Sequence, residues 1–135
     1  MSRHNDELYV GHMRDACDKA ARHLAGAGWL SFLADEMKQD AVIRALEIVG
    51  EAGGKVSKVY RTAHPEIPWR VAKDLRNALI HGYAQVDLRT VWGIASVEVP
   101  ALRTQLQTLF ATIQPSQVIP PSKPATRDED KDRGR

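Results

Sequence analysis

Apolar residues recur at steps of three and four through most of this chain of 135 residues, and this spacing restricts the folds it can adopt. Stripes of this kind cover roughly residues 5–25, 35–60, 68–83 and 88–113. No stretch of convincing length alternates apolar and polar residues as a half-buried strand does. The sequence therefore predicts an all-α fold, most simply an up-and-down four-helix bundle.

Glycine and proline predict where these helices approach one another or bend. Pro100 removes one helical hydrogen bond, so we expect a kink or break in the last helix near residues 97–99. Gly50, Gly53 and Gly54 fall inside the second segment, where each costs about 1 kcal/mol relative to alanine. Either a close helix–helix approach offsets this cost, or the helix breaks near Gly53 and Gly54.

Composition limits the class of protein. Charged residues make up 27% and the hydrophobic set 43%, and the formal net charge of +2 does not indicate a strongly basic nucleic-acid binder. The single cysteine, Cys17, lies on an apolar stripe and is interpreted as a buried core residue in a reducing compartment. The polar N-terminus resembles no signal peptide, and no apolar run approaches the roughly 20 residues that span a bilayer. We expect a soluble cytoplasmic protein without a membrane partner.

The character of the chain changes after residue 114. Four prolines lie between positions 115 and 124, and residues 127–135 mix both charges without an apolar side chain. Such a segment cannot bury a core. The sequence therefore predicts a helical domain over residues 1–114 and a disordered, proline-rich and charged tail over residues 115–135.

The third helical segment carries an unusual group of polar residues. Arg76, Asn77, His81 and Tyr83 crowd into two turns around Gly82. In one interpretation, the arginine and histidine only complement the negative end of the helix dipole, and the tyrosine is a half-buried anchor. In the other, histidine transfers a proton and arginine binds a phosphate. That pair suits cleavage of RNA by its own 2′-hydroxyl, which needs a base and a cation but no metal.

Helical geometry separates these residues. At roughly 100° per residue, Asn77 and His81 share a face, with Arg70 and Lys73 near it. Arg76 lies about 140° away from His81 by the same rule. Three arrangements could bring both to one ligand. The arginine reaches around the helix, the helix unwinds at the glycine after His81, or a second copy of the chain completes the site.

Other chemistry finds little support in the sequence. It contains no phosphate-binding glycine loop, no HExxH or Cys-x-x-Cys spacing, and no Gly-x-Ser-x-Gly turn. The five histidines are scattered, and none pairs with a carboxylate at a metal-ligand spacing. We therefore predict no metal site and no cofactor. Glu51 lies beside the glycines, where a partner group could approach it, but we interpret it as a solvated side chain.

The motif resembles that of a known family. Residues 76–83, Arg-Asn-Ala-Leu-Ile-His-Gly-Tyr, fit the R-x4-H-x-Y pattern of the HepT-like group of HEPN ribonucleases, the toxin halves of MntA–HepT toxin–antitoxin pairs. The stretches 48–52, 64–69 and 91–94 resemble the same family in order and spacing. The resemblance covers roughly residues 5–113 and leaves out the tail.

The resemblance implies a homodimer in which the motif helices face each other across the two-fold axis. A composite cleft would then gather Arg76 and His81 from both chains. It implies that His81 is the acid and base, that Arg76 binds the phosphate and the transition state, and that Asn77 orients the cleft or the RNA backbone. Tyr83 would line the cleft and stack on a base.

The resemblance also implies a partner and a modification. In this family, an MntA-like nucleotidyltransferase antitoxin attaches adenylyl groups to the tyrosine that corresponds to Tyr83. The added bulk and negative charge should repel RNA. Arg70 and Lys73 are further candidates for contacts to the RNA backbone.

The sequence therefore leaves two main candidate functions. The first is a metal-independent endoribonuclease toxin with RNA as its substrate. The alternative is a non-catalytic helical dimer that binds nucleotide or a partner protein through the same cleft. The modest net charge, with no basic stripe beyond Arg70, Lys73 and Arg76, keeps the alternative open. A plain helical oligomerisation domain is the third possibility.

Overall fold

The computed structural model describes residues 3–79 and 86–113 of the chain. Every regular element within these two ranges is helical, and neither range contains a strand. The prediction of an all-α fold is confirmed. The predicted tail over residues 115–135 lies outside the described residues. No helix in the described ranges has both the length and the apolar character needed to cross a bilayer.

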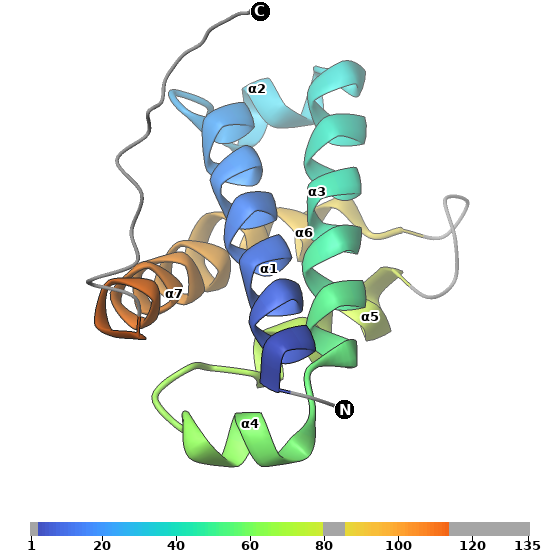
Figure 1. The fold of residues 1–135 in the computed structure, drawn as a ribbon. Helices are drawn as coiled ribbons and strands as arrows, with labels where there is room; N and C mark the ends of the chain where they lie inside the picture. The colour runs from blue at the N-terminus through green and yellow to red at the C-terminus, as the bar shows by residue number, and fades with distance from the viewer. Residues whose placement is uncertain (1–2, 80–85, 114–135) are drawn as a thin grey trace, which may run out of the picture.

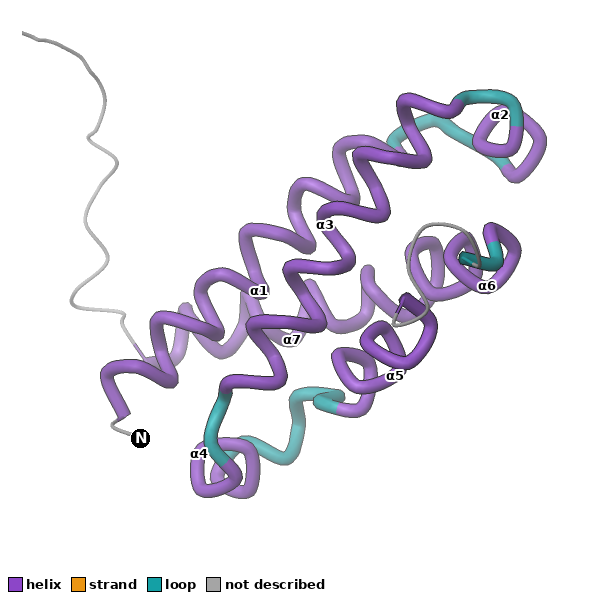
Figure 2. Tube along the Cα trace, turned by 90° about the vertical axis from the view of Figure 1, so that its right-hand side faces the viewer, coloured by secondary structure: helices purple, strands orange, loops and turns teal. Residues whose placement is uncertain are grey.

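Two long antiparallel helices form the centre of the molecule. Helix α1 (Arg3–Leu24) and helix α3 (Glu36–Lys55) lie side by side, and the short α2 (Trp29–Leu33) joins them at one end (Figures 1 and 2). Asp35 caps α3, because its carboxylate accepts the Lys38 N–H at 3.0 Å. The apolar stripes of both helices can therefore meet in one core.

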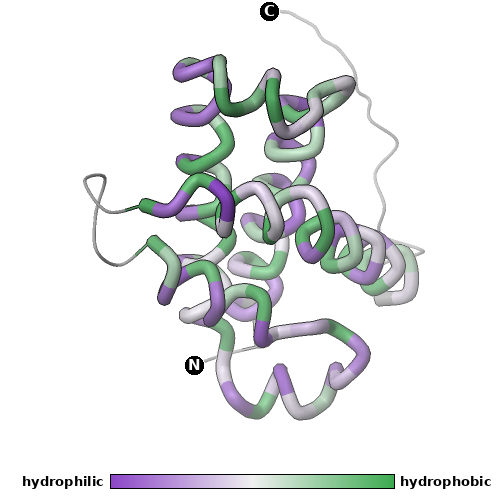
Figure 3. Tube along the Cα trace, turned by 180° about the vertical axis from the view of Figure 1, so that it is seen from behind, coloured by the Kyte–Doolittle hydropathy of each residue, from purple (hydrophilic) through white to green (hydrophobic). Residues whose placement is uncertain are grey.

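The core is built from side chains of α1, α3, α5 (Arg70–Leu79) and α7 (Val99–Ile113), together with the short connecting elements. Apolar and polar positions alternate around each helix, as amphipathic helices require (Figure 3). Burying a large apolar side chain contributes roughly 1.5–3 kcal/mol. The largest fully buried side chains are Phe32, Met13, Leu46, Ile67, Leu75, Leu102 and Leu106.

The second predicted helix is divided. The sequence predicts one helix over about residues 35–60, but α3 ends at Lys55 and a separate helix, α4 (Lys58–Ala63), follows. The prediction was wrong because Ser57 acts as an N-cap. Its Oγ accepts the Tyr60 N–H at 3.1 Å and starts a new helix there.

A buried carboxylate fixes this corner between α3 and α4. Asp6, in the first turn of α1, accepts the Ser57 N–H at 2.8 Å and the Ser57 hydroxyl at 2.7 Å. A buried charge needs such partners. The contact joins two segments that are about fifty residues apart, which periodicity along the chain cannot reveal.

The glycines of α3 allow α5 (Arg70–Leu79) to approach closely. Helix α3 continues through Gly53 and Gly54 and ends at Lys55, so the chain does leave the helix close to these glycines, as the second alternative predicts. A Cβ atom on Gly53 would collide with the Cβ of Ala72 in α5, and one on Gly50 would lie 3.4 Å from the Ala72 carbonyl oxygen. The predicted close helix–helix approach is confirmed.

The motif helix begins later than predicted. The sequence places Pro68 at its first position, but α5 begins at Arg70. Pro68 forms part of a turn, in which its carbonyl accepts the Val71 N–H at 3.0 Å. The Trp69 indole N–H donates to the His64 carbonyl at 2.9 Å and fixes this turn against the end of α4.

The last helical segment changes its winding ahead of Pro100, whereas the sequence predicts a kink or break near residues 97–99. Helix α6 (Leu88–Gly93) passes into a π-helical stretch, η2 (Ile94–Glu98), and then into α7 (Val99–Ile113). Pro100 is the second residue of α7. Proline has no backbone N–H, and the π-helical stretch accommodates the loss of that helical hydrogen bond.

We predict that Gly53→Ala destabilises the fold. The added methyl group must separate α3 from α5, and overpacking of this kind costs about 1–3 kcal/mol. Urea unfolding followed by circular dichroism measures the loss. Gly11→Ala is the matched control, because its Cβ would meet Phe110 at an ordinary 3.7 Å. Equal stability of the Gly53→Ala protein and the wild type would contradict the close approach of α3 and α5.

Candidate functional site

Helix α5 presents the first half of the motif to solvent. Arg76 and Asn77 lie near its C-terminal end, and both are exposed. His81, Gly82 and Tyr83 lie outside the described residues, so their predicted roles stay predictions.

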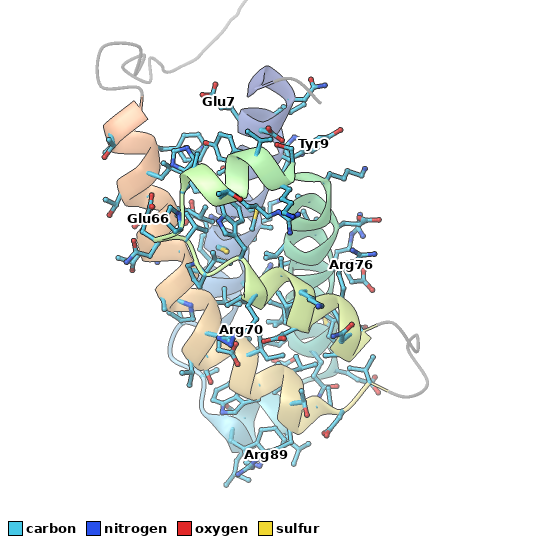
Figure 4. The ribbon with its side chains drawn as sticks, turned by 90° about the horizontal axis from the view of Figure 1, so that it is seen from below. Glu7, Tyr9, Glu66, Arg70, Arg76 and Arg89 are labelled. Atoms are coloured by element: carbon cyan, nitrogen blue, oxygen red, sulfur yellow. The ribbon has the colours of Figure 1, made fainter. Side chains whose placement is uncertain are left out.

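The Arg76 side chain lies along α3. A Cβ atom on Gly50 would be 3.0 Å from its Cγ, and one on Gly54 would be 2.9 Å from its Nη1 and 3.5 Å from its Cδ. The side chain thus follows α3 for about one turn and ends beside Gly54, close to the last residue of α3 (Figure 4). The three arrangements that could bring Arg76 and His81 to one ligand stay predictions, because His81 lies outside the described residues.

The positive charge of the Arg76 guanidinium is not paired with a carboxylate among the described residues. Among residues 3–79 and 86–113, the Arg76 side chain has no ion pair and no hydrogen bond. The last turn of α3 offers it the partial negative charge of a helix C-terminus, which stabilises cations there, although Lys55 carries a positive charge in the same turn. An exposed arginine without a carboxylate partner can bind an anion.

Arg76 borders a groove between α3 and α5. Leucine side chains and Gly50 form the apolar part of its lining, and charged side chains form the rest. The lining residues are Leu46, Gly50, Leu75, Leu79, Arg44, Glu47, Glu51 and Arg76. A cation next to an apolar surface suits a phosphate and the face of the neighbouring base.

A second groove adjoins the first toward the start of α3, and it is acidic. Arg44, Glu47 and Leu79 line both grooves, and Glu36 and Asp40 line the second. Glu47 pairs with Arg44 at 3.3 Å. This part of the surface disfavours a phosphate, so an anion is expected to bind at the Arg76 end.

The other basic residues predicted for the site, Arg70 and Lys73, are on the same helix as Arg76 but do not all face the same groove. Arg70 and Lys73 are exposed on α5, and Arg70 lies 3.9 Å from Asp74, an exposed pair of little energetic weight. Figure 4 shows Arg70 and Arg76 on different sides of α5. A single chain therefore does not join these two arginines in one site.

Three residues of the site were not predicted from the sequence. Gly54 contacts Arg76, and Arg44 and Glu47 line the groove beside it. The four-residue spacing of Gly50 and Gly54 was the available signal, since residues at that spacing share a helix face. Glu51 is exposed, as interpreted from the sequence, but it also lines the groove with Arg76.

Elsewhere in the described residues, reactive side chains are buried or scattered. Cys17 is buried as predicted, and burial, together with the charge of Asp18, raises the pKa of its thiol to about 12. No three histidine, cysteine, aspartate or glutamate side chains in the described ranges are placed to hold a metal ion.

Comparison with known proteins identifies the class to which this bundle and its motif belong. A model of the family described as ribonuclease HepT-like matches residues 13–109, well over half of the chain. The chain therefore belongs to the HepT-like ribonuclease family. The resemblance found in the sequence is confirmed.

Several curated proteins are similar to the chain. "Probable ribonuclease HepT" of Thermococcus cleftensis is 44% identical over 78 residues, which are 58% of this chain and 71% of that protein. A "Putative RNase" of Caldanaerobacter subterraneus subsp. tengcongensis is 31% identical over 76% of this chain and 91% of its own length. Another "Putative RNase", of Methanocaldococcus jannaschii, is 29% identical over 79% and 98%. No solved structure matches the chain significantly.

We predict that Cys17 is unreactive in the folded protein. A thiol with a pKa of about 12 is almost entirely protonated at pH 8, and only the thiolate attacks a disulfide reagent. Reaction with Ellman's reagent should be slow under native conditions and fast in denaturant. Rapid native labelling at pH 8 would show that the thiol is accessible and that the assignment to the core is wrong.

Proposed function

We propose that the protein is an endoribonuclease toxin that cleaves RNA by attack of the 2′-hydroxyl, without a metal, at a site completed by a homodimer. Membership of the HepT-like family supports this proposal, and the names of the similar proteins include ribonuclease. The observation that carries it is the exposed guanidinium of Arg76, which has no carboxylate partner among the described residues and borders a groove.

In this mechanism, His81 removes the proton from the 2′-hydroxyl, whose oxygen attacks the adjacent phosphorus. The bond from phosphorus to the 5′-oxygen breaks, and the imidazolium returns a proton to that leaving oxygen. Arg76 donates to the non-bridging oxygens and stabilises the negative charge that builds up in the transition state. Asn77 orients the RNA backbone beside them.

The direction of the Arg76 side chain favours a site shared between two chains. Within one chain, the Arg76 side chain lies along α3. Asn77 is on the face of α5 that His81 would share if the helix continued. A second copy that faces α5 could supply the missing partner. Arg70 and Lys73, which are also exposed on α5, would then contact the RNA backbone or line the cleft.

We further propose that an MntA-like nucleotidyltransferase silences the toxin by adenylylation of Tyr83. An adenylyl phosphate carries negative charge, and next to Arg76 it would compete with the RNA phosphate for the guanidinium. The nucleoside part would fill the cleft. Both effects would exclude RNA from the site.

A non-catalytic binding module is the second candidate function. The acidic groove formed with Glu36, Asp40 and Glu47 repels RNA and suits a basic segment of a partner protein. Incubation of total RNA with the purified protein distinguishes the two functions. Intact RNA together with a partner held at the acidic groove would favour the binding module.

We predict that Arg76→Ala and His81→Ala each reduce RNA cleavage by at least about 100-fold, because acid–base groups and charge-stabilising donors contribute at this level. The assay uses purified protein, a labelled RNA and excess chelator, in which wild-type cleavage should persist. Arg22→Ala, at an exposed position of α1, is the control and should cleave normally. Sedimentation should show the same dimer for all variants. Undiminished cleavage by either motif variant would refute its catalytic role, and loss of wild-type cleavage in chelator would favour a metal mechanism.

We predict that Tyr83→Phe retains cleavage but escapes silencing. Without the phenolic oxygen, the nucleotidyltransferase has no acceptor, so the intact mass should not increase after incubation with that enzyme and ATP. Tyr9→Phe, on α1, is the matched control and should still be modified and silenced. Modification of the Tyr83→Phe protein to the wild-type extent would place the acceptor elsewhere.

A further inference from the structure

We propose that Gly50 and Gly54 are positioning residues that hold the Arg76 guanidinium in place beside the groove. We call these two residues the glycine seat. The inference rests on the proposed function, because it concerns how the cation of that site is oriented. It assigns a role to two residues that carry no reactive group themselves.

The contacts of Arg76 with the glycine seat are specific. Gly50 and Gly54 are four residues apart and therefore lie on one face of α3, one turn apart. Added Cβ atoms would lie 3.0 Å from the Arg76 Cγ at Gly50 and 2.9 Å from its Nη1 at Gly54. Both distances are shorter than the roughly 3.5–4.0 Å of ordinary carbon contacts. Any side chain at either position would force the arginine to move.

The third glycine of this segment has a different role. A Cβ atom on Gly53 would meet Ala72 of α5 and the Cε of Met13 at 3.2 Å, so Gly53 serves the packing of the helices. Gly54 is exposed and would contact only the flexible end of Arg76. Gly50 serves both functions, because its added Cβ would also lie 3.4 Å from the Ala72 carbonyl oxygen. Substitution of Gly54 therefore tests positioning separately from packing.

The glycine seat orients a cation without neutralising it. An arginine is usually fixed by a carboxylate, which lowers its capacity to bind another anion. In the described part of the chain Arg76 has no such partner, and its stem lies against the bare backbone of α3. A preorganised donor near the reacting phosphate needs no rearrangement when charge develops in the transition state. The glycine seat thus orients the Arg76 guanidinium without a carboxylate that would reduce its positive potential.

Gly54→Ala is the decisive variant. The methyl group should displace the guanidinium while leaving the helix packing intact, because the colliding atom is the end of a flexible side chain. We expect kcat for RNA cleavage to fall by about 10- to 100-fold, as small misplacements of catalytic groups do, with KM changed much less. Gly11→Ala, also within a helix but with an ordinary contact to Phe110 at 3.7 Å, should keep the wild-type kcat.

A second readout needs no RNA. Alanine is a better helix former than glycine, so Gly54→Ala should raise the Tm clearly in an Arg76→Ala background, where nothing occupies the seat. In the presence of Arg76 the same substitution should raise the Tm less or lower it, because the methyl group collides with the arginine. The difference between the two effects measures the contact directly.

The outcomes separate this inference from the proposed function. An active wild type whose Gly54→Ala variant keeps its kcat would overturn the seat and leave the nuclease function standing. A wild type that cleaves no RNA would refute the proposed function, and the Tm comparison would still decide whether Gly54 positions Arg76. Equal Tm effects in the two backgrounds would overturn the seat in either case.

Discussion

The close contact between α3 and α5 at Gly53 and Ala72 governs the rest of the structure. Because Gly53 has no side chain, the two helices approach so closely that even a methyl group would collide there. One turn further along α5, Arg76 is then brought over α3 rather than into open solvent. The groove beside Arg76 lies where these two helices meet, and Leu75 and Leu79 of α5 form part of its lining.

Two polar corners hold the motif helix in this position. Asp6 ties the start of α4 to α1 through Ser57, and the Trp69 indole ties the start of α5 to the end of α4 through His64. Each corner satisfies groups that would be costly to leave without partners away from water. The motif helix is therefore anchored at its beginning.

The charges that line the groove restrict the class of ligand that can bind there. Carboxylates along α3 make one side unfavourable for phosphate, whereas Arg76 offers a cation without a carboxylate partner in the described residues. Membership of the HepT-like family supports a ribonuclease reaction, and we propose that Arg76 takes part in it. In this proposal a second copy of the chain completes the site, because the Arg76 side chain lies along α3 and away from the Asn77 side of α5. Homodimerisation remains a proposal.

The sequence by itself determined the all-α fold, the buried Cys17 and the family, because periodicity and an ordered motif are local properties of the chain. It also predicted that glycines would allow a close approach, but not which helix would approach. Only the tertiary structure decided that α3 ends before Ser57 and that Arg76 lies on Gly50 and Gly54. Both depend on contacts between residues far apart in sequence, which a pattern of neighbours along one chain does not contain.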